Sequence, residues 1–222
     1  MFEDLLYQRL VQAGGQTSAN TSAPTGMMLG TGTKVVATEK MHAQGNMVMT
    51  QNALDIAVSG DGFFQILQPD GTVAYTRDGS FKLSPTGQLI TSGGALLQPT
   101  IQVPNNAQSI TIGADGVVSA KIFGTAEQQV LGNLQLARFI NPAGLESIGQ
   151  NLLRANAASG PVQQLKPGTN GAGQLVQGAL EASNVNVVEE MVNMIETQRA
   201  YEINSKAISA ADQMLKFINT NM

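Results

Sequence analysis

The chain has 222 residues and carries 12 Lys and Arg against 16 Asp and Glu, for a formal net charge of −4. This balance argues against a nucleic-acid binder, because affinity for phosphate backbones rests on clustered basic residues. Cysteine is absent and His42 is the single histidine, which excludes disulfides, thiolate metal sites and two-histidine zinc sites. We therefore expect no cofactor and no metal ion.

The hydropathy pattern predicts no insertion into a lipid membrane. No apolar run approaches the roughly 20 residues that span a bilayer, and the acidic start of the chain, with Glu3 and Asp4, differs from the basic start of a signal peptide. Charged residues are 13% of the chain, compared with about a quarter in an average soluble protein. The surface should therefore be polar but weakly charged.

Residues 1–53 are expected to form an extended N-terminal connecting segment. A short apolar pattern over residues 2–11 leads into a stretch rich in Gly, Ser and Thr at residues 13–26. That stretch has few apolar side chains to bury, so alone it should be extended or mobile. We expect it to become ordered only against a partner.

Residues 54–158 have the pattern of an irregular antiparallel β domain, similar to a sandwich or barrel. Short runs of β-branched and aromatic residues alternate with turn signals, such as Asp61-Gly62 and Asp115-Gly116. The fold class is thus mainly β, followed by a long helix. The predicted strands cover residues 63–67, 73–76, 81–83, 88–91, 109–112, 117–122 and 134–139.

Residues 159–222 should contain a loose linker and then an amphipathic helix over about residues 187–218. Gly and Pro dominate the first part, including the stretch 168–173. Asn186 is placed to cap the helix, with Glu189 three residues later as in a capping box. A helix of this length extends about 48 Å, which is long for a domain of this size.

The apolar residues of this helix predict that it packs on another helix. Two neighbouring lanes run along one side from Ala200 to Ile218, and residues 188–195 are expected to extend the same face backwards. Burying one large apolar side chain is worth roughly 1.5–3 kcal/mol, far more than an i,i+4 ion pair. The predicted packing residues are Val188, Met191, Met194, Ile195, Tyr201, Ile203, Ile208 and Leu215.

The chain has no second long amphipathic helix to cover this surface. Three partners are open: the β domain, other chains, or a segment upstream of Met1 that has been lost. A helix–helix contact satisfies the apolar pattern best, so the helix needs another helix as its partner.

The carboxylates give only a weak signal for an enzyme. Asp61, Asp70, Asp78 and Asp115 could form a pair for general acid and base catalysis, as in a hydrolase. Each precedes Gly, which is the most common placement of Asp in a turn. We therefore predict a protein that is not an enzyme and has no catalytic residues.

Several motifs resemble the bacterial flagellar basal-body rod and hook family. The most specific is Gln198-Arg199-Ala200-Tyr201-Glu202, within the segment 183–202, and the segments 60–64, 75–81 and 141–149 agree. Residues 2–8 and the loose stretch after them are similar to the distal rod members rather than to the proximal rod or hook members. The N-terminal helix with which the family begins is absent, so the chain is expected to lack a few tens of residues.

The resemblance implies a structural function. Subunits would assemble helically. The N- and C-terminal helices of each subunit would pair as a coiled coil in an inner tube, the β domain would form the outer layer, and the loose stretch would stiffen the rod. The resulting hollow drive shaft would transmit torque to the hook and let exported subunits pass. The expected site is the flagellar basal body, from periplasm to outer membrane, reached by flagellar type III export without a cleaved signal.

The partners that the resemblance implies are other copies of the chain, the proximal rod proteins, the hook protein, the P- and L-ring bushing and the rod cap. Two alternatives remain open. The chain could be a proximal rod or hook-family sibling, or a secreted adhesin or phage-tail-like structural protein. The second alternative would share the β domain but has no need of the motif at residues 198–202.

Overall fold

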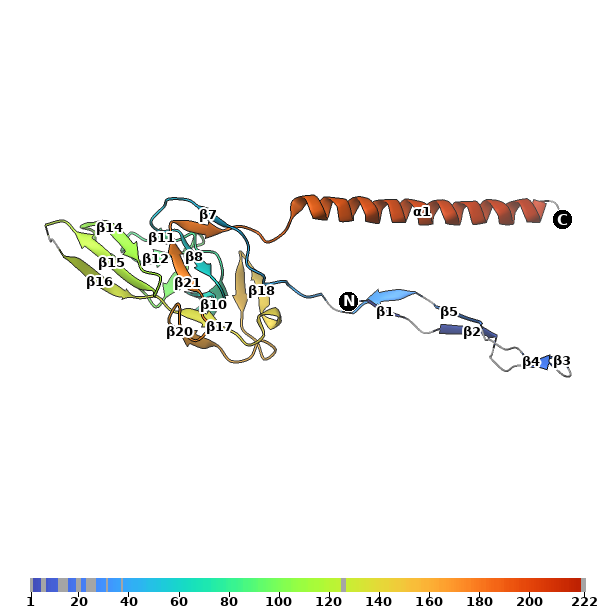
Figure 1. The fold of residues 1–222 in the computed structure, drawn as a ribbon, viewed down its shortest axis with the longest axis horizontal. Coiled ribbons are helices and arrows are strands. Elements are labelled where there is room, and N and C mark those ends of the chain that lie inside the picture. Colours follow the sequence, from blue (N-terminus) through green and yellow to red (C-terminus); the bar gives the residue numbers. More distant parts are fainter. Residues whose placement is uncertain are drawn as a thin grey trace. The chain divides into compact units, whose positions relative to one another are not determined.

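The computed structural model describes residues 2–4, 7–11, 16–18, 21–22, 27–30, 32–36, 38–124 and 127–220. Residues 1–42 and 43–222 form two compact units. Figure 1 shows the strands of both units and the long C-terminal helix. The fold class is the predicted one, with antiparallel strands followed by one helix.

The first unit is built from antiparallel strand pairs that are nested along the chain. The outer pair is β1 (Phe2–Asp4) with β6 (Thr33–Val35), the middle pair is β2 (Tyr7–Val11) with β5 (Met27–Gly30), and the inner pair is β3 (Gln16–Ser18) with β4 (Thr21–Ser22). Nested pairs of this kind make one long hairpin. Of the stretch predicted to be loose, β3 and β4 are described, and residues 13–15, 19–20 and 23–26 lie outside the described residues.

The second unit is organised by a seven-stranded antiparallel sheet in the order β11-β12-β13-β9-β10-β19-β18. Its strands are β9 (Phe64–Leu67), β10 (Val73–Thr76), β11 (Lys82–Leu83), β12 (Leu89–Ile90), β13 (Leu96–Gln98), β18 (Glu146–Gly149) and β19 (Leu152–Arg154). A short 3₁₀ helix at Pro142–Gly144 precedes β18.

The remaining strands of the second unit form smaller antiparallel sheets. A three-stranded sheet contains β14 (Ala107–Ile112), β15 (Val117–Ile122) and β16 (Gln128–Asn133). The two-stranded pairs are β7 (Met47–Met49) with β22 (Ala179–Glu181), β8 (Ile56–Ser59) with β21 (Gln174–Gln177), and β17 (Leu136–Arg138) with β20 (Gln163–Leu165).

All seven predicted strands have counterparts, in β9, β10, β11, β12, β14, β15 and β17. In the second unit, the sequence prediction missed β7, β8, β13, β16 and β18 to β22. The last three, β20 to β22, were missed because their Gly-rich surroundings have the composition of loose chain. Their partners β17, β8 and β7 lie far upstream, and no local pattern reveals such pairing. The stretch 168–173 is an ordered turn, in which the amide of Gly168 donates to the carbonyl of Gly173 at 2.9 Å.

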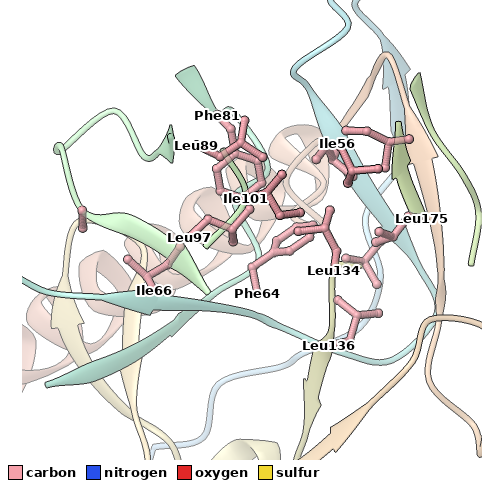
Figure 2. Close-up of a cluster of buried hydrophobic side chains, with 14 of the residues drawn as sticks. Ile56, Phe64, Ile66, Phe81, Leu89, Leu97, Ile101, Leu134, Leu136 and Leu175 are labelled. Atoms are coloured by element: carbon pink, nitrogen blue, oxygen red, sulfur yellow. The ribbon is translucent and has the colours of Figure 1, made fainter. Parts of the chain in front are cut away.

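The central strands β9 and β10 of the seven-stranded sheet are buried on both faces. Consecutive residues of a strand point to opposite faces, so Phe63 and Phe64 enter different clusters of the core. Phe64 packs edge-on against Phe81 with ring centroids 5.1 Å apart, in the larger cluster that Figure 2 shows. Tyr75 and Phe139 pack edge-on at 4.8 Å in the smaller cluster. Burial raises the pKa of the Tyr75 phenol.

The turn at Asp78-Gly79 has no room for a side chain. A Cβ built on Gly79 would lie 1.7 Å from the carbonyl oxygen of Ile56, and the amide of Ile56 donates to the carbonyl of Gly79 at 3.0 Å. Glycine is therefore required for the close approach of β8 to this turn.

Replacing Phe64 with Ala should lower the free energy of unfolding by roughly 3–5 kcal/mol, because a large cavity opens in the core. Phe64 is fully buried at 0% exposure. Denaturant-induced unfolding of the purified chain measures the change. The matched control is Phe123→Ala, since Phe123 is 75% exposed and its loss should cost less than about 0.5 kcal/mol. Equal costs for the two variants would contradict this description of the core.

Candidate functional site

The candidate site is the helix α1 (Val187–Thr220), which has 34 residues. It begins at the predicted residue: the side-chain oxygen Oδ1 of Asn186 accepts a hydrogen bond from the amide of Val188 at 3.2 Å. Glu189 and Glu190 lie in the first turn, where negative charge is favoured by the helix dipole. At 1.5 Å per residue the helix is about 51 Å long.

The predicted packing residues lie on this helix without contributing to the core of the chain. Every side chain of α1 whose burial the structure describes is exposed. Val188, Tyr201 and Ile203 are 70%, 77% and 65% exposed. Met191, Met194, Ile195 and Ile208 are exposed as well, and the side chain of Leu215 lies outside the described part. The role of these residues in packing stays a prediction.

The apolar residues of α1 do not form one continuous face. On one side, Met191 and Ile195 are followed by the polar residues Glu202, Ser209 and Lys216 at spacings of one or two turns. On another side the order is reversed, so that Glu189 and Glu196 are followed by Ile203, Ala207 and Met214. The sequence interpretation, which extended a single face backwards to Val188, does not hold for a straight helix.

The segment just before α1 is fixed to the start of the second unit. The amide of Ala182 donates to the carbonyl of Asn46 at 2.8 Å, and the side-chain amide of Asn184 donates to the carbonyl of Ala43 at 2.9 Å. A Cβ on Gly45 would lie 1.9 Å from the carbonyl oxygen of Ala182. Two segments that are far apart in sequence thus lie side by side at the base of the helix.

Arg77 is the residue that ties this base to the sheet, and the sequence analysis missed it. Its guanidinium contacts Glu181 at 2.6 Å between Nε and Oε2, and it donates to the carbonyls of Val58, Gly60 and Gly62. Glu181 in turn accepts a hydrogen bond from the amide of Gly45. The signal for Arg77 was available only as part of the family motif at residues 75–81.

The four aspartates of the hydrolase alternative lie in separate turns. Asp70, Asp78 and Asp115 each accept a hydrogen bond from the backbone amide two residues later, as in an Asx turn. Hydrogen bonds from the hydroxyl and amide of Thr72 lower the pKa of Asp70. This favours the ionised carboxylate, whereas a general acid has to be protonated. Asp61 lies 3.9 Å from Arg138 in an exposed ion pair. These contacts support turn roles for the aspartates.

Within the described ranges, no three residues among His, Cys, Asp and Glu gather into a group that could hold a metal ion. Among those same residues, no helix is both long and apolar enough to cross a membrane.

Comparison with known proteins identifies the family. Residues 57–120 match the flagellar hook protein FlgE/F/G D1 domain, and residues 176–221 match the C-terminal domain of flagellar basal body rod FlgEFG proteins. The chain is 51% identical to the flagellar basal-body rod protein FlgG of Buchnera aphidicola from Acyrthosiphon pisum, over 97% of this chain and 83% of that protein. The chain belongs to the flagellar basal-body rod protein family.

Two other rod proteins of the family are nearly as similar. The FlgG of Borreliella burgdorferi is 50% identical over 98% of this chain and 83% of its own length. The FlgG of Caulobacter vibrioides is 46% identical over 97% of this chain and 82% of its own length. The chain is thus a structural subunit of the flagellar rod and lies in the basal body. Helix α1 falls within the matched C-terminal rod domain.

Replacing Arg77 with Ala should lower the free energy of unfolding by roughly 2–4 kcal/mol, because Glu181 and three carbonyls lose their donor in a partly buried place. Chemical denaturation of the purified chain measures this. Arg154→Ala is the matched control: Arg154 pairs with Glu146 at 2.8 Å on the surface, and such pairs contribute less than about 1 kcal/mol. A cost for Arg77→Ala no larger than that of the control would refute the role of Arg77.

Proposed function

We propose that this chain is a subunit of the distal rod, which assembles helically into a hollow drive shaft. The shaft transmits torque to the hook and lets exported subunits pass through its channel. The observation that carries the proposal is the exposed apolar surface of α1 on a member of the rod family. A surface of that kind on a long helix marks a contact with other protein.

The energetics of α1 favour assembly over a free helix. Several large apolar side chains, among them Met191, Ile203 and Phe217, are exposed to water. Covering each contributes roughly 1.5–3 kcal/mol, so a few of them offset the entropy lost when subunits associate. We assign α1 to a coiled-coil inner tube, where it packs on helices of other subunits.

The other parts of the chain fit the outer layers of a shaft. The β-strand part of the second unit, residues 43–184, is called the β unit here. Its two core clusters pack on opposite faces of the central strands, which suits it to the outer layer. The hairpin of β1 to β6 is two-stranded, and isolated two-stranded hairpins are only marginally stable in water. We propose that it becomes rigid by packing on neighbouring subunits and so stiffens the rod.

Low charge density suits a shaft that turns inside a bushing. Charged residues are 13% of the chain, and strong complementary charge would hold the shaft to its surroundings. The proposed partners are further copies of the chain, the proximal rod proteins, the hook protein, the P- and L-rings and the rod cap. We also propose flagellar type III export, and that the chain has no enzymatic activity.

The distal rod is favoured over a sibling of the family by the order of the similarities. Identities of 37–51% are found with flagellar basal-body rod proteins FlgG, the lower value with that of Bacillus subtilis. The flagellar hook-basal body complex protein FlhP of Bacillus subtilis is 31% identical over 99% of this chain and 84% of its own length. A rod subunit of the FlgG kind is therefore the function that these observations support best.

Ile203→Asp and Ile208→Asp should each stop rod growth, because a carboxylate in the helix contact costs several kcal/mol to desolvate. Swimming on soft agar and electron microscopy of basal bodies measure the effect. Both side chains are 65% exposed in the free chain, so its free energy of unfolding should change little. Ser205→Asp and Ser209→Asp, on a different side of the same half of α1, are the matched controls and should swim. Normal swimming by both isoleucine variants would refute the assembly role.

The position in the flagellum is tested by immunolabelling. An antibody raised against residues 54–153 should label the shaft between the inner ring and the hook in basal bodies whose rings have been stripped. Label on the hook, or only at the proximal end, would reassign the chain to a sibling of the family. An unlabelled basal body would refute the proposed function.

A further inference from the structure

The turn between β20 and β21 presents the pair Asn170-Gly171 to solvent. The amide of Ala172 donates to the carbonyl of Thr169 at 2.8 Å, and Asn170 and Gly171 between them have φ angles of 50° and 78°. Positive φ at both central residues is characteristic of a type I′ turn, for which Asn-Gly is a preferred sequence. Both residues are exposed. The pair is thus held in an ordered turn that water reaches.

The two groups that would react with each other in this turn have no other hydrogen-bond partner. Among the described residues, nothing bonds to the side-chain carboxamide of Asn170, and the amide of Gly171 has no acceptor. Gly171 also lacks a side chain that would hinder the approach of its nitrogen to Cγ of Asn170. Asparagine is a thermolabile residue, and a following glycine leaves this route of attack open.

Arg138 lies against the peptide bond that joins these two residues. Its Nη1 donates a hydrogen bond to the carbonyl oxygen of Asn170 at 3.3 Å, and a Cβ on Gly171 would lie 3.2 Å from the same nitrogen. When the amide of Gly171 loses its proton, resonance shares the negative charge between its nitrogen and this carbonyl oxygen. A guanidinium beside the oxygen stabilises the anion. Arg138 therefore favours the nucleophilic form of the Gly171 nitrogen.

We propose that Asn170 is a site of spontaneous deamidation, promoted by Arg138. The deprotonated nitrogen of Gly171 attacks Cγ of Asn170. The N–Cγ bond forms, the Cγ–Nδ2 bond breaks, and Nδ2 leaves as ammonia after taking up the proton that the amide has lost. Water then opens the succinimide ring: cleavage of the new N–Cγ bond gives aspartate, and cleavage of the original peptide bond gives isoaspartate. The reaction consumes water, releases ammonia and does not depend on the proposed rod function.

The two products should affect the turn differently. Aspartate adds a negative charge close to Arg138, whose other carboxylate neighbour, Asp61, lies 3.9 Å away, and it leaves the main chain unchanged. Isoaspartate inserts a methylene into a main chain that is closely packed just beyond: the amide of Gly173 donates to the carbonyl of Asp61 at 2.7 Å, and a Cβ on Gly173 would lie 2.5 Å from the carbonyl oxygen of Ser59. Isoaspartate should therefore loosen the contact of this turn with residues 59–61 as a subunit ages.

Asn151 is a matched control within the same chain. It has a φ of 59°, it is exposed, and its carbonyl also accepts a side-chain hydrogen bond, from Oγ1 of Thr76 at 2.9 Å. That donor carries no charge, and the next residue is the buried Leu152, whose side chain hinders attack by its nitrogen. Exposure and positive φ alone would make both asparagines reactive, whereas the proposed chemistry selects Asn170.

Mass spectrometry of protease fragments tests the proposal on the purified chain, incubated in warm, mildly alkaline buffer. Conversion of asparagine to aspartate or isoaspartate adds about 1 Da. The fragment with Asn170 should gain this mass with time, in both product forms, and the fragment with Asn151 should not. Arg138→Ala should slow the gain several-fold, whereas Arg154→Ala, which removes a surface arginine paired with Glu146, should leave the rate unchanged.

The same incubation in denaturant separates the effect of the fold from that of the sequence. There Arg138 no longer contacts the turn, so the unaltered chain and Arg138→Ala should react at equal rates. Circular dichroism verifies that the variant is folded in buffer. A folded chain that keeps Asn170 intact while the denatured chain reacts, or equal rates at Asn170 and Asn151, would overturn the site. A folded Arg138→Ala chain that reacts as fast as the unaltered chain would overturn the role of Arg138.

Discussion

The apolar surface that α1 exposes to water is the constraint on which the rest of this structure depends. The helix extends about 51 Å, and none of its side chains that the structure describes is buried. An exposed apolar surface on a long helix marks a site of contact with other protein. Under the function proposed here, covering this surface drives assembly, and the helix joins the rest of the chain to the polymer.

Force can pass between helix and body only if the junction between them is firm. The chain enters the β unit at residues 43–49 and leaves it at residues 179–184, and these segments pair through β7 and β22. Arg77 holds the exit strand through Glu181, β8 through the carbonyl of Val58, and the turn before β9 through the carbonyls of Gly60 and Gly62. Both ends of the β unit are therefore held beside Arg77, which directly follows β10 of the seven-stranded sheet.

Local sequence patterns predicted the elements that depend on local interactions. Gly-containing turns such as Asp61-Gly62 delimited the strands that follow, and Asn186 marked the start of the helix. Strands β20 to β22 could not be predicted, because each depends on pairing with an earlier strand. The partners of β21 and β22 are β8 and β7, which lie more than a hundred residues upstream. Their own composition is that of a loop.

The candidate helix was predicted from its sequence, and so was the need for a partner, because both follow from 3.6-residue periodicity and the cost of exposed apolar surface. The family motif at residues 198–202 was likewise readable in the chain alone. Only the tertiary structure decided how β7, β8 and β22 close the β unit and that Arg77 anchors the base of α1. Those contacts depend on hydrogen bonds between distant segments, whose free energy exists only once the chain has brought them together.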